Sequence, residues 1–214
     1  MITAVICDLD GLLADTEKYH MKAYQETFAA EGVIVSDEDY ITHWIRNCST
    51  IGEFIAQRKL GFDPDLMRSK KTVRYHSYVE SHVEEMPGAV SFLQRIHGHK
   101  RLALASNSLR QDIDRVLGKI GADGFFEVLL SKLDVAEPKP APDMFIKTAA
   151  RLNEPVTRCV VVEDSCGGVE AAHRAGMKCI AVPSRYTVDN DFSRASIVVD
   201  RLDDVTVELL DSLK

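Results

Sequence analysis

The sequence lacks the features that would direct it to a membrane or a nucleic acid. No apolar run in its 214 residues is long enough to span a bilayer. Basic residues are a minority, with 26 Lys and Arg against 33 Asp and Glu, so the formal net charge is −7. Nucleic acids and anionic lipid surfaces repel an acidic protein. We therefore expect no nucleic acid and no membrane as a partner, whereas a small anion could still bind beside a metal or a few cations.

The cysteines also lack any spacing that would suggest a metal or redox motif. There are five of them, with no Cys-x-x-Cys pair. Two of them, Cys7 and Cys159, belong to apolar runs, which favours reduced, buried thiols and a cytoplasmic location. Met1 leads directly into the first apolar run, so we expect no signal peptide. Internal repeats are absent. The sequence leaves the oligomeric state open, and a monomer is the default expectation.

What the sequence does contain is a set of short apolar runs rich in β-branched residues, which are typical of strands buried on both faces. Helical patterns lie between these runs at 109–120 and 143–152. A third helical pattern follows Gly167-Gly168, and we expect these two glycines to form a tight turn. This alternation predicts an α/β fold with a Rossmann-like, doubly wound and mostly parallel sheet. The predicted strands are residues 2–7, 101–105, 126–130, 159–162, 179–182 and 197–199.

The segment between the first two strands has a different pattern. It has helical periodicity and no buried strand, and Asp15 or Thr16 is expected to cap its first helix. We therefore predict a helical domain at 15–83, inserted into an α/β core made of 1–14 and 84–214. The predicted helices in the insertion are 16–30, 37–46, 50–59 and 64–83.

Polar residues follow three of the buried strands. In a parallel sheet these carboxyl ends share one edge, where open α/β sheets bind their ligands. Carboxylates at such an edge need a compensating charge, and a hard divalent cation with oxygen ligands is the usual one. Ser106 is expected to cap the following helix, and Lys139 lies in a proline-rich loop on the same side. The strand-end residues are Asp8, Asp10, Ser106, Asn107, Glu163 and Asp164.

Four stretches together resemble the haloacid dehalogenase superfamily of phosphotransferases. They occur in the family's order and cover the whole predicted core. The helical insertion after the first stretch resembles the helical-cap subclass, which includes β-phosphoglucomutase and many phosphosugar and phosphoglycolate phosphatases. The stretches are DLDGLLADTE at 8–17, LASNS at 104–108, EPKPAPD at 137–143 and VEDSCGG at 162–168.

The resemblance implies a role for each of the first two carboxylates. Asp8 would be the nucleophile that becomes an aspartyl phosphate, and it would also bind Mg²⁺. Asp10 would protonate the leaving oxygen and then activate water, while its main-chain carbonyl binds the metal.

The resemblance also implies roles for the remaining strand-end residues. Asp164 and Glu163 would complete the Mg²⁺ site, with Glu163 binding directly or through water. Ser106 and Asn107 would donate hydrogen bonds to the phosphoryl oxygens, and Lys139 would pair with Asp8 and the phosphoryl group.

The inserted helices should set the substrate. His20, which follows Tyr19, resembles the histidine of the β-phosphoglucomutase linker, and Arg46 and Lys70 are further candidates for contacts with the leaving group. The cap of that mutase also carries a Gly-x-x-Arg stretch, and the corresponding region at 44–50 lacks the glycine. This difference favours a hydrolase over a mutase. Lys70, Lys71 and Arg74 could supply cations for the substrate, but the pattern favours a solvated helix face for these three residues.

We therefore predict an Mg²⁺-dependent phosphomonoester hydrolase that acts through an aspartyl phosphate on a small phosphorylated metabolite such as a phosphosugar. A phosphohexomutase like β-phosphoglucomutase is the alternative in chemistry. A catalytically silent module that binds a metal or a partner is the alternative of another class.

Overall fold

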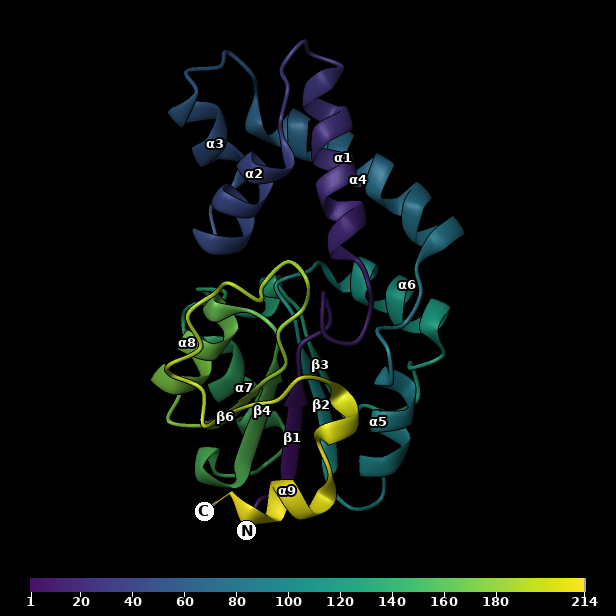
Figure 1. The fold of residues 1–214 in the computed structure, drawn as a ribbon, viewed down its shortest axis with the longest axis vertical. Coiled ribbons are helices and arrows are strands. Elements are labelled where there is room, and N and C mark those ends of the chain that lie inside the picture. The colour runs from purple at the N-terminus through teal and green to yellow at the C-terminus, as the bar shows by residue number, and fades with distance from the viewer. Residues whose placement is uncertain (214) are drawn as a thin grey trace. The chain divides into compact units, whose positions relative to one another are not determined.

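The computed structural model, which describes residues 1–213, contains a six-stranded parallel sheet (Figure 1). The strand order is β3-β2-β1-β4-β5-β6, and every neighbouring pair is parallel. The prediction of a doubly wound α/β fold is therefore confirmed. The strands are β1 Ala4–Cys7, β2 Arg101–Ala105, β3 Val128–Leu130, β4 Cys159–Glu163, β5 Lys178–Ala181 and β6 Ile197–Val198.

Strand β1 lies between β2 and β4, and this register determines which residues meet at the carboxyl edge. Cys7, the last residue of β1, is opposite Leu104 of β2 and Val162 of β4. All residues of β1 are buried, as expected for a strand covered on both faces. Asp8 therefore emerges from the sheet beside the ends of β2 and β4.

Helices cover both faces of the sheet (Figure 1). On one face, α7 and α8 pack against alternate strand residues such as Ile6, Ala103 and Val161. Figure 1 shows α5 and α6 on the other side. The sequence analysis predicted α6, α7 and α8 but not α5 or α9. The helices are α5 Ala89–Ile96, α6 Arg110–Ile120, α7 Asp143–Arg151, α8 Cys166–Arg174 and α9 Val207–Ser212, with short 3₁₀ turns at Lys132–Asp134, Val156–Arg158 and Leu202–Asp204.

Two expectations about helix starts in this sheet unit were wrong. Ser106 does not cap α6, because Leu109 occupies the N-cap position and the Ser106 hydroxyl accepts from the Ser108 N–H instead. Gly167 and Gly168 do not form a turn either. They lie within the first turn of α8, which is capped by the Ser165 hydroxyl accepting from the Gly168 N–H at 3.1 Å.

The chain divides into two compact units. The first, here the sheet unit, comprises Met1–Asp15 and Glu84–Lys214, and the second, here the helical unit, comprises Thr16–Val83. Two hydrogen bonds join the segments of the sheet unit that flank the insertion. The Asp15 N–H donates to the Glu84 carbonyl at 3.0 Å, and the Met86 N–H donates to the Leu13 carbonyl at 2.9 Å. The insertion therefore leaves and re-enters the sheet unit at neighbouring points.

The helical unit follows the predicted pattern closely. Its helices are α1 Glu17–Ala29, α2 Asp37–Tyr40 continuing into a π-helical turn Ile41–Arg46, α3 Ile51–Gln57 and α4 Pro64–His82. Helices α2 and α3 begin with reciprocal capping boxes, from Ser36 with Asp39 and from Thr50 with Glu53. The core of the unit contains Phe28, Val35, Tyr40, Ile51, Phe54, Ile55 and Met67.

Three details of the helical unit bear on the sequence predictions. Thr16 is the N-cap residue of α1, although its side chain makes no capping hydrogen bond. Lys71 was expected on a solvated face, and this is wrong, because it is one of the buried residues of α4. Among residues 1–213, no helix combines the length and the apolar character that crossing a bilayer requires.

Candidate active site

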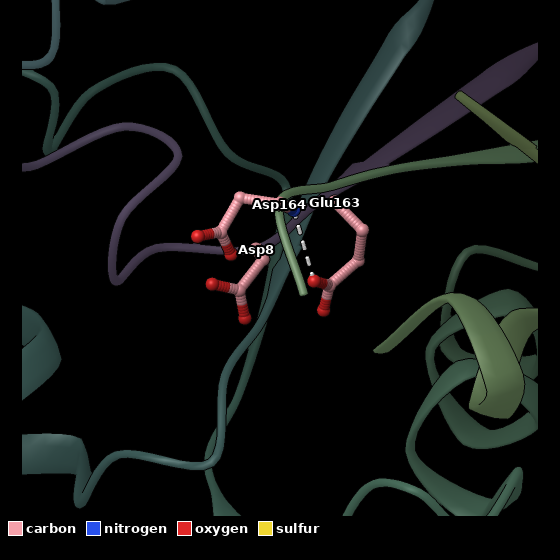
Figure 2. Close-up of side chains that lie close together, drawn as sticks. All are labelled: Asp8, Glu163 and Asp164. Carbon is pink, nitrogen blue, oxygen red and sulfur yellow. Dashed lines mark hydrogen bonds between the residues drawn. The ribbon is translucent and has the colours of Figure 1, made fainter. Parts of the chain in front are cut away.

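Three carboxylates meet at the carboxyl edge of β1 and β4 (Figure 2). Asp8 follows β1, Glu163 ends β4, and Asp164 follows it. One oxygen from each residue lies within 4.8 Å of the others, and all three residues are buried. Burying like charges this close together is costly unless a cation neutralises them. The three oxygens suit a hard divalent cation such as Mg²⁺, which takes carboxylate ligands.

Gly11 allows the chain to pass directly against this cluster. A Cβ atom at position 11 would lie 2.4 Å from Asp164 Oδ2, and the residue has a φ of +81°. Any side chain there would both clash with the carboxylate and strain the backbone. The glycine of the first motif therefore leaves room for Asp164 to face Asp8, as a shared cation site requires.

Lys139 supplies the positive charge of the cluster. Its side chain is buried, and its Nζ donates to Asp8 Oδ1 at 2.6 Å, Glu163 Oε1 at 2.6 Å and the Ala105 carbonyl at 2.7 Å. All three ammonium donors thus have an acceptor. Burial alone would lower the pKa of Lys139, but the two carboxylates outweigh burial and raise the pKa above its usual value. The lysine is therefore positively charged.

The Asp8 carboxyl is also perturbed. Burial raises the pKa of Asp8 to about 8, the carboxylates of Glu163 and Asp10 add to the shift, and the Lys139 ammonium opposes it. A cation among the carboxylates would oppose the effect of burial in the same direction as Lys139 does. The site thus makes the charge of Asp8 depend on the cations around it.

Glu163 is held by donors at both of its oxygens. Oε1 accepts from Lys139, and Oε2 accepts from the Asp164 N–H at 3.1 Å, the Ser165 N–H at 3.1 Å and the Ser165 hydroxyl at 2.9 Å. Figure 2 shows the bond from the Asp164 main chain as a dashed line. In this arrangement Glu163 orients Lys139 and the turn that carries Asp164.

Gly168 leaves room for the Glu163 carboxylate. A Cβ atom at position 168 would lie 1.8 Å from Glu163 Oε1, so only glycine fits. This is the physical reason for the second glycine of the motif, which the sequence analysis had assigned to a turn.

Asp10 belongs to a second group of polar side chains, formed with the segment after β2. Its Oδ2 accepts from the Ser108 hydroxyl at 2.7 Å and from the Ser106 hydroxyl at 3.2 Å. The motif at 104–108 contains Ser108, but the resemblance implies no role for it. The available signal was a second hydroxyl two residues after Ser106, in a bend where the Ser108 N–H donates to the Ser106 hydroxyl at 3.0 Å.

Asn107 lies between these serines and bonds the main chain of Lys139 at two points. Its Nδ2 donates to the Lys139 carbonyl at 3.0 Å, and its Oδ1 accepts from the Lys139 N–H at 3.1 Å. The structure therefore brings together every strand-end residue named from the sequence, with Lys139 joined to the ends of β1, β2 and β4.

The three predicted specificity residues lie in the helical unit and have partners there. His20 stacks on Tyr75 with ring centroids 3.9 Å apart, and its Nδ1 shares a hydrogen bond with the buried Lys71 ammonium. Lys70 pairs with Glu31, and Arg46 lies 3.8 Å from Glu38. Lys71 is more buried than any of these three residues, although the sequence favours a solvated position for it. Its ammonium also lies over the rings of Tyr24 and Tyr75.

A parallel sheet with a buried acidic cluster and a lysine at its carboxyl edge defines an α/β enzyme with an acidic active site. The family model of haloacid dehalogenase-like hydrolases matches residues 5–182, which contain all the strand-end residues. The chain therefore belongs to the haloacid dehalogenase-like hydrolases. The resemblance recognised in the sequence and the prediction of a phosphatase-type enzyme are confirmed.

Individual relatives support the same assignment. The protein CbbY of Rhodobacter capsulatus is 35% identical over 208 residues, covering 91% of each chain. The fructose-1-phosphate phosphatase YqaB of Escherichia coli is 30% identical over 179 residues, covering 83% of this chain and 95% of YqaB.

A solved relative has the same fold. The crystal structure of CbbY from Rhodobacter sphaeroides in complex with phosphate is 29% identical, covers 99% of this chain and 100% of that one, and superposes with a TM-score of 0.86. A mutant of the same protein in complex with xylulose-(1,5)bisphosphate is 28% identical with a TM-score of 0.86, covering 95% of this chain and 96% of that one.

Proposed function

We propose that the chain is an Mg²⁺-dependent phosphomonoester hydrolase that acts through an aspartyl-phosphate intermediate on a small phosphorylated metabolite, with phosphosugars as the substrate class. The observation that carries the proposal is the buried Asp8–Lys139 pair beside Asp164, in a chain of a hydrolase family. Phosphoryl transfer needs a nucleophile and positive charge at one point, and this pair supplies both.

In the proposed reaction Asp8 attacks the phosphorus of a bound phosphate monoester. A carboxylate needs no base to act as a nucleophile, provided it is ionised. The bond from phosphorus to the leaving oxygen breaks as the bond to Asp8 forms. Lys139 stays beside Asp8 and offsets the negative charge of the phosphoryl oxygens. Water then hydrolyses the aspartyl phosphate, which releases inorganic phosphate and restores Asp8.

Asp10 is proposed to move the protons. It would give a proton to the leaving oxygen and then take one from the attacking water. Its contacts with the Ser106 and Ser108 hydroxyls hold the carboxylate at the edge where Asp8 also lies. Ser106 is also proposed to donate to a phosphoryl oxygen, since a hydroxyl can turn from Asp10 to a bound anion.

The metal site is proposed to consist of Asp8, Asp164 and the Asp10 carbonyl, with Glu163 in direct or water-mediated contact. The cation would orient the phosphoryl group and neutralise part of its charge. Because both oxygens of Glu163 already accept hydrogen bonds, we favour a role for this residue through Lys139 and the 163–165 turn.

The two compact units are proposed to be a core domain of 1–14 and 84–214 and a helical cap domain of 15–83, which differ from the observed units only in the assignment of Asp15. In this proposal the cap selects the leaving group. His20 is the preferred specificity residue, because it combines an aromatic stack with a bond to a buried ammonium. Arg46 and Lys70 are also candidates for contacts with the leaving group. A substrate would have to replace their ion pairs with Glu38 and Glu31.

The relatives support sugar phosphates as the substrate class. YqaB is named a fructose-1-phosphate phosphatase, and one CbbY structure contains a xylulose bisphosphate. Both ligands are phosphorylated ketoses. A panel of ketose and aldose monophosphates and bisphosphates is therefore the first set of substrates to test.

The experiment that tests the proposal is phosphate release from this panel with Mg²⁺, for the wild type and Asp8→Asn. We expect release from at least one sugar phosphate and loss of activity in Asp8→Asn. Asp114→Asn is the matched control, because Asp114 forms an exposed i,i+4 pair with Arg110 on α6, and it should keep full activity.

Other outcomes separate the alternatives. Interconversion of phosphohexoses that depends on a bisphosphate primer, without net phosphate release, would identify a mutase. No release above the Asp8→Asn background on the whole panel would contradict the hydrolase proposal and favour a silent binding module.

A further inference from the structure

The loop that carries Lys139 has few main-chain N–H groups with which to form hydrogen bonds. Pro138, Pro140 and Pro142 have no N–H, so the Lys139 and Ala141 amides are the only backbone donors of this stretch. The Ala141 N–H donates back to the Pro138 carbonyl at 3.0 Å. Residues 136–138 are exposed and Lys139 is buried, so the chain enters the site at this one residue.

Asn107 supplies both main-chain partners of Lys139. One amide side chain accepts from the N–H and donates to the carbonyl of the same residue. A neighbouring strand would satisfy a residue in the same manner, and buried main-chain groups need such partners. The side chain of Asn107 therefore replaces a strand where the prolines rule one out.

The position of the Lys139 ammonium depends on this anchorage. The lysine side chain has four rotatable bonds, and its Nζ must lie 2.6 Å from both Asp8 and Glu163. A main-chain shift of about 1 Å would break bonds of this length, and such misplacements are costly for catalysis. Asn107 is well placed to prevent the shift.

We propose that Asn107 is a positioning residue, which holds the main chain of Lys139 so that its ammonium reaches Asp8 and Glu163. The consequence for catalysis rests on the proposed function. This role is distinct from the direct phosphate contact expected for Asn107 from the sequence, which would use the second proton of Nδ2.

Hydrogen exchange tests the anchorage without any need for turnover. Because the stretch 138–142 has only two amide protons, mass spectrometry of a fragment containing it resolves Lys139 with little overlap. We expect Asn107→Ala to speed exchange at Lys139 roughly tenfold, as the loss of one hydrogen bond predicts. Asn107 is exposed, so the variant should fold with an unchanged unfolding midpoint.

Two further variants serve as controls for this experiment. Asn107→Asp has the same shape, but it places a carboxylate oxygen against the Lys139 carbonyl, so exchange should again be faster than in the wild type. Gln111→Ala removes an exposed amide side chain at the start of α6, and exchange at Lys139 should not change. Wild-type exchange in Asn107→Ala would overturn the proposal.

A double-mutant cycle tests the consequence for activity. Asn107→Ala should lower kcat/KM roughly tenfold in the wild type and less than about twofold in Lys139→Ala, because residues that act through one another are not additive. An equal loss in both backgrounds would mean that Asn107 acts on the substrate, and it would overturn the proposal. Inactivity of the wild type on all phosphate esters would contradict only the proposed function, because the exchange result does not depend on it.

Discussion

The sheet unit and the helical unit both bury a lysine, but they surround it differently. In the sheet unit Lys139 contacts two carboxylates and a carbonyl, all brought from the ends of different strands. In the helical unit Lys71 lies over the rings of Tyr24 and Tyr75 and bonds with the imidazole of His20. The first environment concentrates opposite charges, as phosphoryl transfer requires. The second packs a cation against aromatic rings, an arrangement that also occurs where proteins recognise cationic ligands. The comparison therefore fits the proposal that the sheet unit carries the chemistry and the helical unit the substrate selection.

The largest expected effect separates the two lysines by activity. Lys139→Ala should lower kcat by about 10³-fold, the order found when a preorganised donor to a reacting anion is removed. Lys71→Ala should mainly raise KM, by about tenfold, because it weakens binding and leaves the reacting groups in place. Steady-state kinetics on the best substrate measures both. Lys178→Ala, at an exposed position of β5, should behave as the wild type. Equal losses of kcat in Lys139→Ala and Lys71→Ala would contradict the proposed division of roles between the two units.

The next prediction compares how a glycine-to-alanine substitution in each unit changes the free energy of unfolding. Gly168→Ala would drive a Cβ into the Glu163 carboxylate, which four donors hold in place, so we expect a loss of about 3 kcal/mol in the free energy of unfolding. Gly52→Ala in α3 is the matched control, because its Cβ would meet its nearest neighbours at an ordinary 3.8 Å. That variant should gain about 0.5–1 kcal/mol from helix propensity. Urea denaturation gives both values, and a neutral Gly168→Ala would show that Glu163 is free to move.

The third prediction concerns metal binding. A cation that binds only the folded protein should stabilise it by about 2.7 kcal/mol at 100 times its dissociation constant. Thermal unfolding with Mg²⁺ or with a chelator measures this gain. Asp164→Asn should lose the gain, whereas Glu38→Gln, at an exposed acidic position of the helical unit, should keep it. An undiminished gain in Asp164→Asn would remove Asp164 from the metal site.

The smallest effect is expected for the cysteines. Cys48 of the helical unit is exposed, whereas Cys7, Cys159 and Cys179 of the sheet unit are buried. Burial raises the pKa of Cys159 to about 11 and raises the pKa of Cys7 and Cys179 further. Because thiolates are the reactive form, a thiol reagent at pH 8 should label Cys48 first. Cys48→Ser should abolish this fast phase, with less than a twofold change in activity. Cys166 is half-buried and is the next thiol expected to react, so Cys166→Ser is combined with Cys48→Ser. A fast phase that persists in this double variant would show that the sheet unit opens readily.

The strand ends could be predicted from the sequence because short β-branched runs mark buried parallel strands. This pattern alone places Asp8, Ser106 and Glu163 at one edge of the sheet. The contacts beyond that edge could not be predicted in the same way. Ser106 resembles a helix cap locally, but its hydroxyl donates to Asp10, 96 positions earlier in the chain. Lys71 resembles its half-buried neighbour Lys70, and only the packing of α1 against α4 shows that Lys71 is buried.

The sequence by itself determined the alternation of strands and helices, the helical insertion, and the family whose motifs follow the strands. These features depend on local patterns of apolar residues, prolines and glycines, which act over a few positions. Only the tertiary structure decided that Asn107 pairs with the main chain of Lys139, that Ser108 bonds Asp10, and that Gly168 makes room for Glu163. These contacts join separate loops of the sheet edge, and their distances follow from strand register and packing, which no local pattern specifies.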